Sequence, residues 1–154
     1  MSGANFSATV FLTSTGEVRA CTGHSCDADF KAVILENILN FWGAEEYGII
    51  EAESDPALHY IGFSGDVRVR LDRPPIPYVI DKTTLVAGSG DFVTITGLHI
   101  PCTIVVDDPD PAVETATHTV EDGGFEFEPE TPGVYIIEIS RFPFLPATIE
   151  ITAT

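Results

Sequence analysis

Basic residues, cysteines and long apolar runs are all scarce in this sequence. Seven Lys and Arg stand against 24 Asp and Glu in 154 residues, which gives a formal net charge of −17. A surface this acidic repels phosphate backbones and anionic lipids, so we expect neither nucleic acid nor a membrane as a partner. No apolar run approaches the roughly 20 residues that a membrane-spanning helix needs. Two interpretations of the acidic surface remain: it is solvated and keeps the protein soluble, or it contacts a basic or cation-bridged partner.

The N-terminus lacks the basic start and apolar stretch of a signal peptide, so we expect synthesis and folding in a cytoplasm. Cysteines are limited to Cys21, Cys26 and Cys102. Free thiols are expected in a reducing cytoplasm. A disulfide between Cys21 and Cys26, closing a small ring at the tip of a hairpin, is one alternative. Intermolecular bridges formed after release into an oxidising medium are another.

Catalytic and metal-binding motifs are also missing. Gly62–Gly65 lacks the spacing and the strand-to-helix context of a nucleophile elbow. The acidic run 107–114 has neither the glycine nor the spacing of an EF-hand calcium loop, and an acidic solvated loop is the favoured interpretation. We therefore expect a protein that is not an enzyme and holds no cofactor or metal. A zinc site is chemically conceivable from two cysteines and two histidines in different predicted domains: Cys21, His24, His99 and Cys102.

The N-terminal part shows the pattern of a small α+β module. Ala8–Leu12 and Glu17–Cys21 are strand-like and flank a turn at 14–16, which predicts a hairpin. Residues 22–27 are predicted to form a loop. Gly62–Gly65 is predicted to be a second hairpin turn. Further short strands are predicted at 47–53, 58–61 and 66–71.

A helix is predicted over residues 28–42, capped by Asp27 or Asp29 and ended by Gly43. Its apolar residues cover about half of the helical circumference, so the helix should be buried against a sheet or a neighbouring subunit. We expect three of these side chains in particular to be buried and to carry an interaction: Ile34, Ile38 and Trp42.

Three prolines within residues 74–77 predict a stiff connector, because proline fixes φ and removes an amide donor. The expected division is a docking module at 1–73 and a β-sandwich at 78–154. Phe125 and Phe127 alternate with glutamates, as on a strand with one buried face. The spacing of about seven strands is typical of an immunoglobulin-like sandwich. The predicted strands are 78–87, 91–98, 102–107, 115–120, 124–128, 133–141 and 147–153.

Negative charge is concentrated in this second part. Residues 83–154 hold twelve acids against the single base Arg141, a net charge of −11. Asp107, Asp108 and Asp110 follow a predicted strand and should be exposed. They are the predicted docking surface for a basic neighbour, with binding steered by electrostatics.

Several turn motifs together resemble a known family. They are Thr15-Gly16-Glu17, His59-Tyr60-Ile61, the proline connector, Val93–Leu98, Pro101–Val106, Val120–Gly123, Pro132–Tyr135 and Phe142–Leu145. This order resembles small accessory proteins of tailed bacteriophages, whose C-terminal half is an immunoglobulin-like module.

The resemblance implies a non-enzymatic structural or accessory protein of the virion, at the neck, tail, fibre base or capsid surface. Its expected partners are other virion proteins, in a multi-copy or homo-oligomeric arrangement. Two alternatives remain open: a carbohydrate-binding adhesion module, and a tail-fibre assembly chaperone that is absent from the finished particle.

Overall fold

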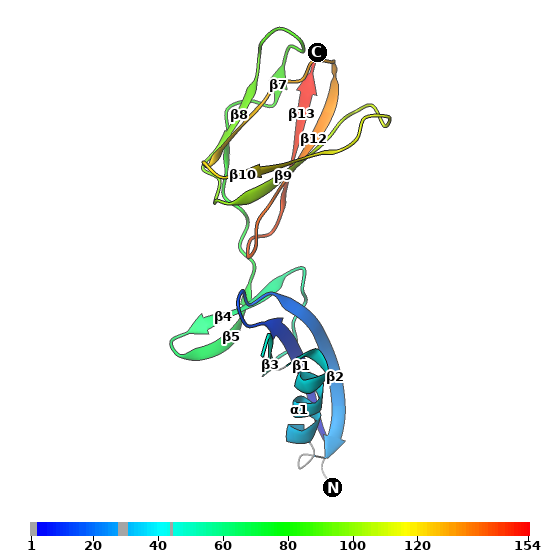
Figure 1. Cartoon of the computed structure of the whole chain (residues 1–154), viewed down its shortest axis with the longest axis vertical. Coiled ribbons are helices and arrows are strands. Elements are labelled where there is room, and N and C mark those ends of the chain that lie inside the picture. Colours follow the sequence, from blue (N-terminus) through cyan, green and yellow to red (C-terminus); the bar gives the residue numbers. More distant parts are fainter. Residues whose placement is uncertain (1–2, 28–30, 44) are drawn as a thin grey trace. The chain divides into compact units, whose positions relative to one another are not determined.

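The computed structural model describes residues 3–27, 31–43 and 45–154. The fold is mainly β, with several antiparallel sheets and one helix within the described residues, as the sequence predicts (Figure 1). It divides into two compact units, Met1–Arg73 and Pro74–Thr154. The boundary falls at the first proline of the connector.

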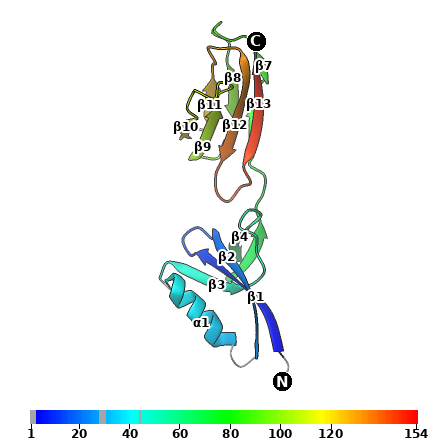
Figure 2. The same ribbon diagram turned by 90° about the vertical axis from the view of Figure 1, so that its right-hand side faces the viewer.

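The first unit is built on a three-stranded antiparallel sheet in the order β2-β1-β3. The helix α1 packs against β1 and β3, and Figure 2 shows it beside the sheet. A separate hairpin, β4–β5, completes the unit. The bounds are β1 (Gly3–Leu12), β2 (Val18–Asp27), α1 (Lys31–Trp42), β3 (Tyr47–Glu51), β4 (His59–Ser64) and β5 (Val67–Asp72).

The two faces of this sheet have different partners because side chains alternate along a strand. Ala8 and Val10 of β1 are fully buried, and Ala8 lies opposite Thr22, which is close to α1. A bulge between Val10 and Phe11 shifts the register. Phe11 then packs with Val18 and Ile61 in a second cluster. The small unit therefore has apolar packing on both sides of one sheet.

Two local predictions for this unit are wrong, and a third falls partly outside the described residues. Residues 22–27 continue β2 as a strand, because they pair with Gly3–Ala8 of β1 although their sequence has no alternation of apolar and polar residues. Gly62 lies inside β4, and the hairpin turn is at Gly65–Asp66, where Gly65 takes the positive φ of 62° that a tight turn requires. The described part of the helix is Lys31–Trp42; the predicted cap Asp29 lies outside the described residues, and the other predicted cap, Asp27, is the last residue of β2.

The predicted end of the helix is confirmed. Gly43 has a φ of 99° and its amide donates to the Leu39 carbonyl at 2.9 Å. A left-handed residue at this position is least costly for glycine.

The second unit is a β-sandwich. Five strands form one sheet in the order β10-β9-β12-β13-β7, and three form the other in the order β11-β8-β6; only β7 and β13 pair in parallel. The bounds are β6 (Val79–Ile80), β7 (Thr84–Leu85), β8 (Val93–Thr96), β9 (Cys102–Asp107), β10 (Ala116–Val120), β11 (Gly124–Phe127), β12 (Gly133–Ser140) and β13 (Ala147–Ala153).

The core of the sandwich shares one specific feature with immunoglobulin-like folds, a hydrogen-bonded tyrosine beside the buried contact between the sheets. Ile95 of β8 and Ile137 of β12 are fully buried in one cluster drawn from both sheets. Two residues before Ile137, the hydroxyl of Tyr135 donates to the Thr131 carbonyl at 2.9 Å. A tyrosine with this hydrogen bond is the tyrosine corner of immunoglobulin-like folds. In antibody domains, the residue two positions after that tyrosine is a cysteine of the disulfide between the sheets. Here apolar packing takes the place of that bond.

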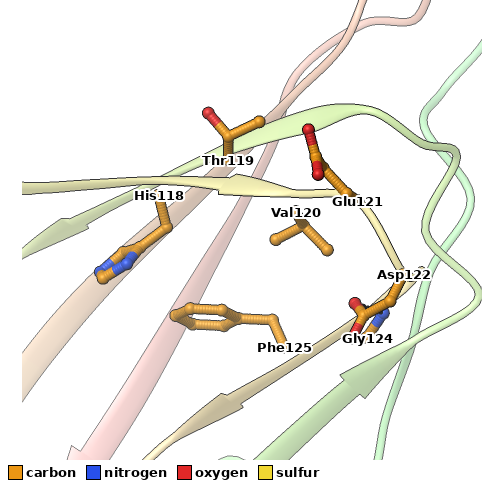
Figure 3. Close-up of a pocket in the computed structure, with 7 residues that line it drawn as sticks. All are labelled: His118, Thr119, Val120, Glu121, Asp122, Gly124 and Phe125. Carbon is orange, nitrogen blue, oxygen red and sulfur yellow. Dashed lines mark hydrogen bonds between the residues drawn. The ribbon is translucent and has the colours of Figure 1, made fainter.

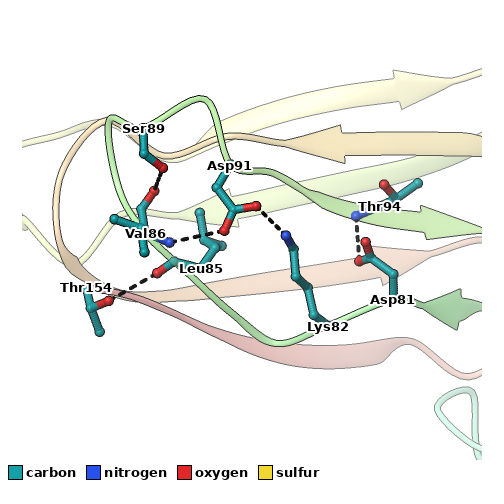
Figure 4. A network of polar contacts seen from close by, with 8 residues as sticks. All are labelled: Asp81, Lys82, Leu85, Val86, Ser89, Asp91, Thr94 and Thr154. Carbon is teal, nitrogen blue, oxygen red and sulfur yellow. Dashed lines mark hydrogen bonds and ion pairs between the residues drawn. The ribbon is translucent and has the colours of Figure 1, made fainter.

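The predicted strand 78–87 is divided between the two sheets. β6 pairs with β8, whereas β7 pairs with β13, and the chain crosses between them at 81–83. Asp81 accepts from the Thr94 amide at 2.8 Å on one side of the crossing. On the other side Asp91 forms an ion pair with Lys82 and accepts from the Val86 amide at 3.3 Å (Figure 4). These polar contacts hold the crossing segment in place.

Gly16→Ala should destabilise the first unit. Gly16 has a φ of 81°, and an added Cβ would lie 1.9 Å from the Ile61 carbonyl oxygen. We expect a loss of about 2–4 kcal/mol, from the left-handed backbone and the backbone clash together. Gly65→Ala is the matched control, because Gly65 has a positive φ with open space around it, and should cost only about 1–2 kcal/mol. Urea unfolding of both variants measures the difference, and equal losses would contradict the clash.

Asp91→Asn should flatten the acid dependence of stability. The hydrogen bond from Lys82 lowers the pKa of Asp91 below its ordinary value. The folded state therefore gains stability from this carboxylate above the ordinary Asp pKa, and loses it as pH falls through the lowered pKa. Urea unfolding at pH 7 and at low pH should show a smaller difference for Asp91→Asn than for the parent. Lys82→Met removes the largest of the contributions that lower this pKa and should also flatten the pH dependence, to a smaller extent because the backbone amides of Val86 and Phe92 remain; an unaltered pH dependence in both variants would refute the assignment.

Candidate functional site

An apolar groove runs along α1. It has a volume of about 520 Å³. One wall comes from β2 and the rest from the helix. The groove is lined by Thr22, Ile34, Asn37, Ile38, Phe41 and Trp42. We call this set the α1 groove.

The helix is less buried than its apolar pattern predicts. Ile34, Ile38 and Trp42 are only half-buried by this chain, and the expected burial against a neighbouring subunit stays a prediction. The apolar arc is broad, whereas the sheet that it covers has only three strands, so part of the arc stays uncovered. Phe41 remains 86% exposed and contacts Trp42 edge-on, with ring centroids 6.2 Å apart.

Trp42 is held in position from the other side of the groove. Its ring lies 5.5 Å from that of Tyr47 at the start of β3, just after Gly43 turns the chain. The groove therefore has a fixed aromatic wall and one freely exposed ring, Phe41. Among the described residues, none that lines the groove is charged, although the chain as a whole carries −17. Sequence reasoning found Ile34, Ile38 and Trp42 but did not single out Phe41, whose exposure depends on the width of the sheet.

Cys21 is a free thiol, which rules out the Cys21–Cys26 disulfide in this structure. The two residues lie on one continuous strand, where five residues span about 16 Å, and a disulfide tolerates Cα separations only to about 7 Å. The Ser54 amide donates to the sulfur of Cys21 at 3.3 Å. Thr9, fully buried on β1, donates to the Ala52 carbonyl at 2.7 Å beside it. The thiol is part of the packing between strands.

Two other residues of the zinc alternative have different roles in the sandwich. Cys102 is buried in its core, where desolvation raises the pKa of the thiol and the charge of Arg141 acts in the opposite direction. The ring of His99 stacks on Phe144 with centroids 4.8 Å apart. Within the described residues, no group of three or more His, Cys, Asp or Glu side chains is arranged to hold a metal ion.

The predicted acidic docking surface lies on the β9–β10 loop, and its carboxylates help to shape that loop. Asp107 accepts from the Thr115 hydroxyl at 2.8 Å. Asp108 accepts from the Asp110 amide at 2.8 Å, and Asp110 accepts from the Ala112 amide at 2.9 Å. These are turns of the kind that Asp side chains stabilise locally. Asp108 and Asp110 also border a cleft of about 390 Å³ that Glu128, Glu130 and Tyr135 help to line.

A third hollow lies at an open margin of the sandwich, between β10 and β11. It has a volume of about 340 Å³. The rings of His118 and Phe125 lie side by side there, with centroids 5.3 Å apart (Figure 3). Sequence reasoning missed this pair, because the two residues belong to different sheets and meet only in the folded sandwich. We call the hollow the margin pocket.

No protein-family model and no curated protein matches the sequence. Two solved structures are similar: crystal structures of glycosyl hydrolase family 2 members from Bacteroides cellulosilyticus, each 13% identical, with TM-scores of 0.36 and 0.35. The matches cover 96% and 95% of this chain but only 21% and 23% of those chains. A likeness this weak carries no argument about function. Within the described residues, no helix is long and apolar enough to cross a membrane.

The turns of the β9–β10 loop should persist when Asp108 and Asp110 are replaced by Asn but not when they are replaced by Ala. Asp108→Asn and Asp110→Asn retain the oxygen that accepts the loop amides, so hydrogen exchange in residues 107–115 should match that of the parent. Asp108→Ala and Asp110→Ala remove it and should raise local exchange, with a cost of about 0.5–1.5 kcal/mol for each hydrogen bond. Exchange mass spectrometry compares the pairs; identical exchange in the Asn and Ala variants would show that the turns do not depend on these oxygens.

Proposed function

We propose that this chain is a non-enzymatic structural or accessory protein of a tailed-bacteriophage particle, which acts through contacts with other virion proteins. The observation that carries the proposal is the α1 groove with the exposed ring of Phe41 beside it. The resemblance of the turn motifs to phage accessory proteins supports the particle as the setting.

The groove has the physical properties of a protein-docking surface. Exposed aromatic rings beside apolar hollows are frequent anchors, since burying one such ring contributes about 1.5–3 kcal/mol. Small soluble units rarely leave such surface exposed without a use. The uncharged lining allows another protein to approach this face without meeting the chain's carboxylates directly.

The occupant that fits best is an apolar segment of a different particle protein. Two copies of this chain would each bring a net charge of −17 into contact range, and such self-repulsion opposes homotypic docking. A neighbour with fewer acids or with basic residues meets no such cost. Several copies can then enter a particle through the symmetry of that neighbour.

Phe41→Ser should abolish incorporation into particles. The side chain is 86% exposed, so the folded chain should lose less than about 0.5 kcal/mol, while the anchor for docking is removed. Asn40→Ser is the matched control on the same helix, because Asn40 is exposed and does not line the groove. Mass spectrometry of purified particles measures incorporation of each variant.

The outcomes separate the alternatives. Normal incorporation of Phe41→Ser would overturn the groove as the docking surface. Absence of the parent protein from finished particles, combined with binding to fibre proteins during assembly, would favour the chaperone. Incorporation of the parent and of Asn40→Ser, with loss of Phe41→Ser, supports the proposal.

A further inference from the structure

The sandwich has one sheet edge that is not protected in the usual ways. β6 and β7, which end the two sheets on one side, are only two residues long. On the other side β11 carries Glu126, whereas β10 has five residues and no charge. Proteins normally shield such edges with charge, proline, bulges or short strands, because an open edge pairs with other chains.

The outer edge of β10 is accessible and uncharged, yet acids lie at both of its ends. Its first four residues, Ala116–Thr119, are exposed, and Val120 is buried in the core. Glu114 precedes the strand, and Glu121 and Asp122 follow it. A segment that pairs with β10 therefore lies between carboxylates.

The margin pocket opens at this same edge. His118 and Val120 share one face of β10, and Val120 belongs to the core, so this face points towards the other sheet. His118 meets Phe125 of β11 there, and Glu121 and Asp122 also line the pocket (Figure 3). An added strand would place every second side chain on this inner face, beside the pocket.

We propose that β10 receives an extended segment of a partner protein as a sixth strand of the larger sheet, with a Lys or Arg side chain of that segment in the margin pocket. Main-chain hydrogen bonds supply the pairing, as in other cases of strand addition. The apolar stem of the basic side chain lies on Phe125 and its cation is directed to the carboxylates of Glu121 and Asp122. Long basic side chains suit a site of this kind, with an aromatic face and an acidic rim.

Charge complementarity decides between this occupant and a second copy of the chain. Residues 74–154 contain thirteen acids and two bases, a net charge of −11. Pairing β10 with β10 of another copy would bring two such units together and is opposed by like-charge repulsion. A basic extended segment gains from the same field. The site lies in a different unit from the α1 groove and extends the proposed function without depending on it.

The test uses the full chain and a defined probe. The probe is a blocked heptapeptide, Thr-Val-Thr-Arg-Thr-Val-Thr, compared with the same peptide carrying Glu in place of Arg. Each is titrated to about 5 mM against isotope-labelled protein, where a site with a millimolar Kd is largely occupied. We expect the Arg peptide to shift the amide signals of residues 116–125 and the Glu peptide to leave them unchanged. Two further peptides carry N-methyl groups, one on the odd-numbered amides and one on the even-numbered amides. Only one of these two sets faces β10, so one of the two peptides should lose binding.

Variants separate the pocket from general acidity. Glu121→Gln with Asp122→Asn should raise the Kd roughly three- to tenfold, as the loss of two exposed charge pairs implies, and should make binding less sensitive to salt. The Asp122→Asn change keeps a side-chain oxygen that can accept the Gly124 amide, so the turn is preserved. Glu138→Gln with Glu150→Gln is the control, because both residues are exposed on inner strands of the same sheet and the charge change is equal.

Phe41→Ser should bind the Arg peptide normally, which distinguishes this site from the α1 groove. Loss of particle docking in that variant with intact peptide binding would leave this inference standing. Absence of shifts at β10, shifts confined to other strands, or equal binding of the Glu peptide would overturn it. Concentration-dependent shifts of the β10 amides without peptide would overturn it in favour of a second copy.

Discussion

The limited size of the first unit is the constraint from which its surface follows. A unit of about 70 residues buries only a modest share of its apolar surface. Here three strands must cover a helix whose apolar arc is broad, and β1 also packs against the hairpin side through Phe11. The sheet fills its own two faces with Ala8, Val10 and Phe11, and the outer part of the helix stays open. The α1 groove is the part of the helix's apolar surface that the three-stranded sheet does not cover.

The second unit must hold two sheets together without a disulfide bond. It has no disulfide between its sheets, so cohesion comes from fully buried Ile95 and Ile137 and from the hydrogen-bonded Tyr135. Polar contacts are used at the points where the backbone changes direction, as at the crossing between β6 and β7. Acidic side chains are thereby kept on loops and outer faces. β10 itself carries no acidic side chain.

Both proposed contact surfaces are uncharged regions within an acidic chain. No charged residue is among the described residues that line the α1 groove, and β10 contains no Asp, Glu, Lys or Arg. Surrounding carboxylates repel other acidic chains and favour basic ones, so charge acts on the choice of partner while apolar and main-chain contacts supply the binding. Both proposed contacts therefore assign partner choice to charge and binding to apolar and main-chain groups.

Local chemistry in the sequence determined the mainly β fold, the sandwich strands and the end of the helix at Gly43, because alternation and left-handed glycines act over a few residues. The tertiary structure decided the rest. Residues 22–27 are a strand because β1 pairs with them, and 78–87 is two strands because its halves meet different sheets. Cys21 and Cys26 are kept apart by that same extension of β2. The exposure of Phe41 and the meeting of His118 with Phe125 depend on how much surface a neighbouring element covers, which periodicity along one segment does not encode.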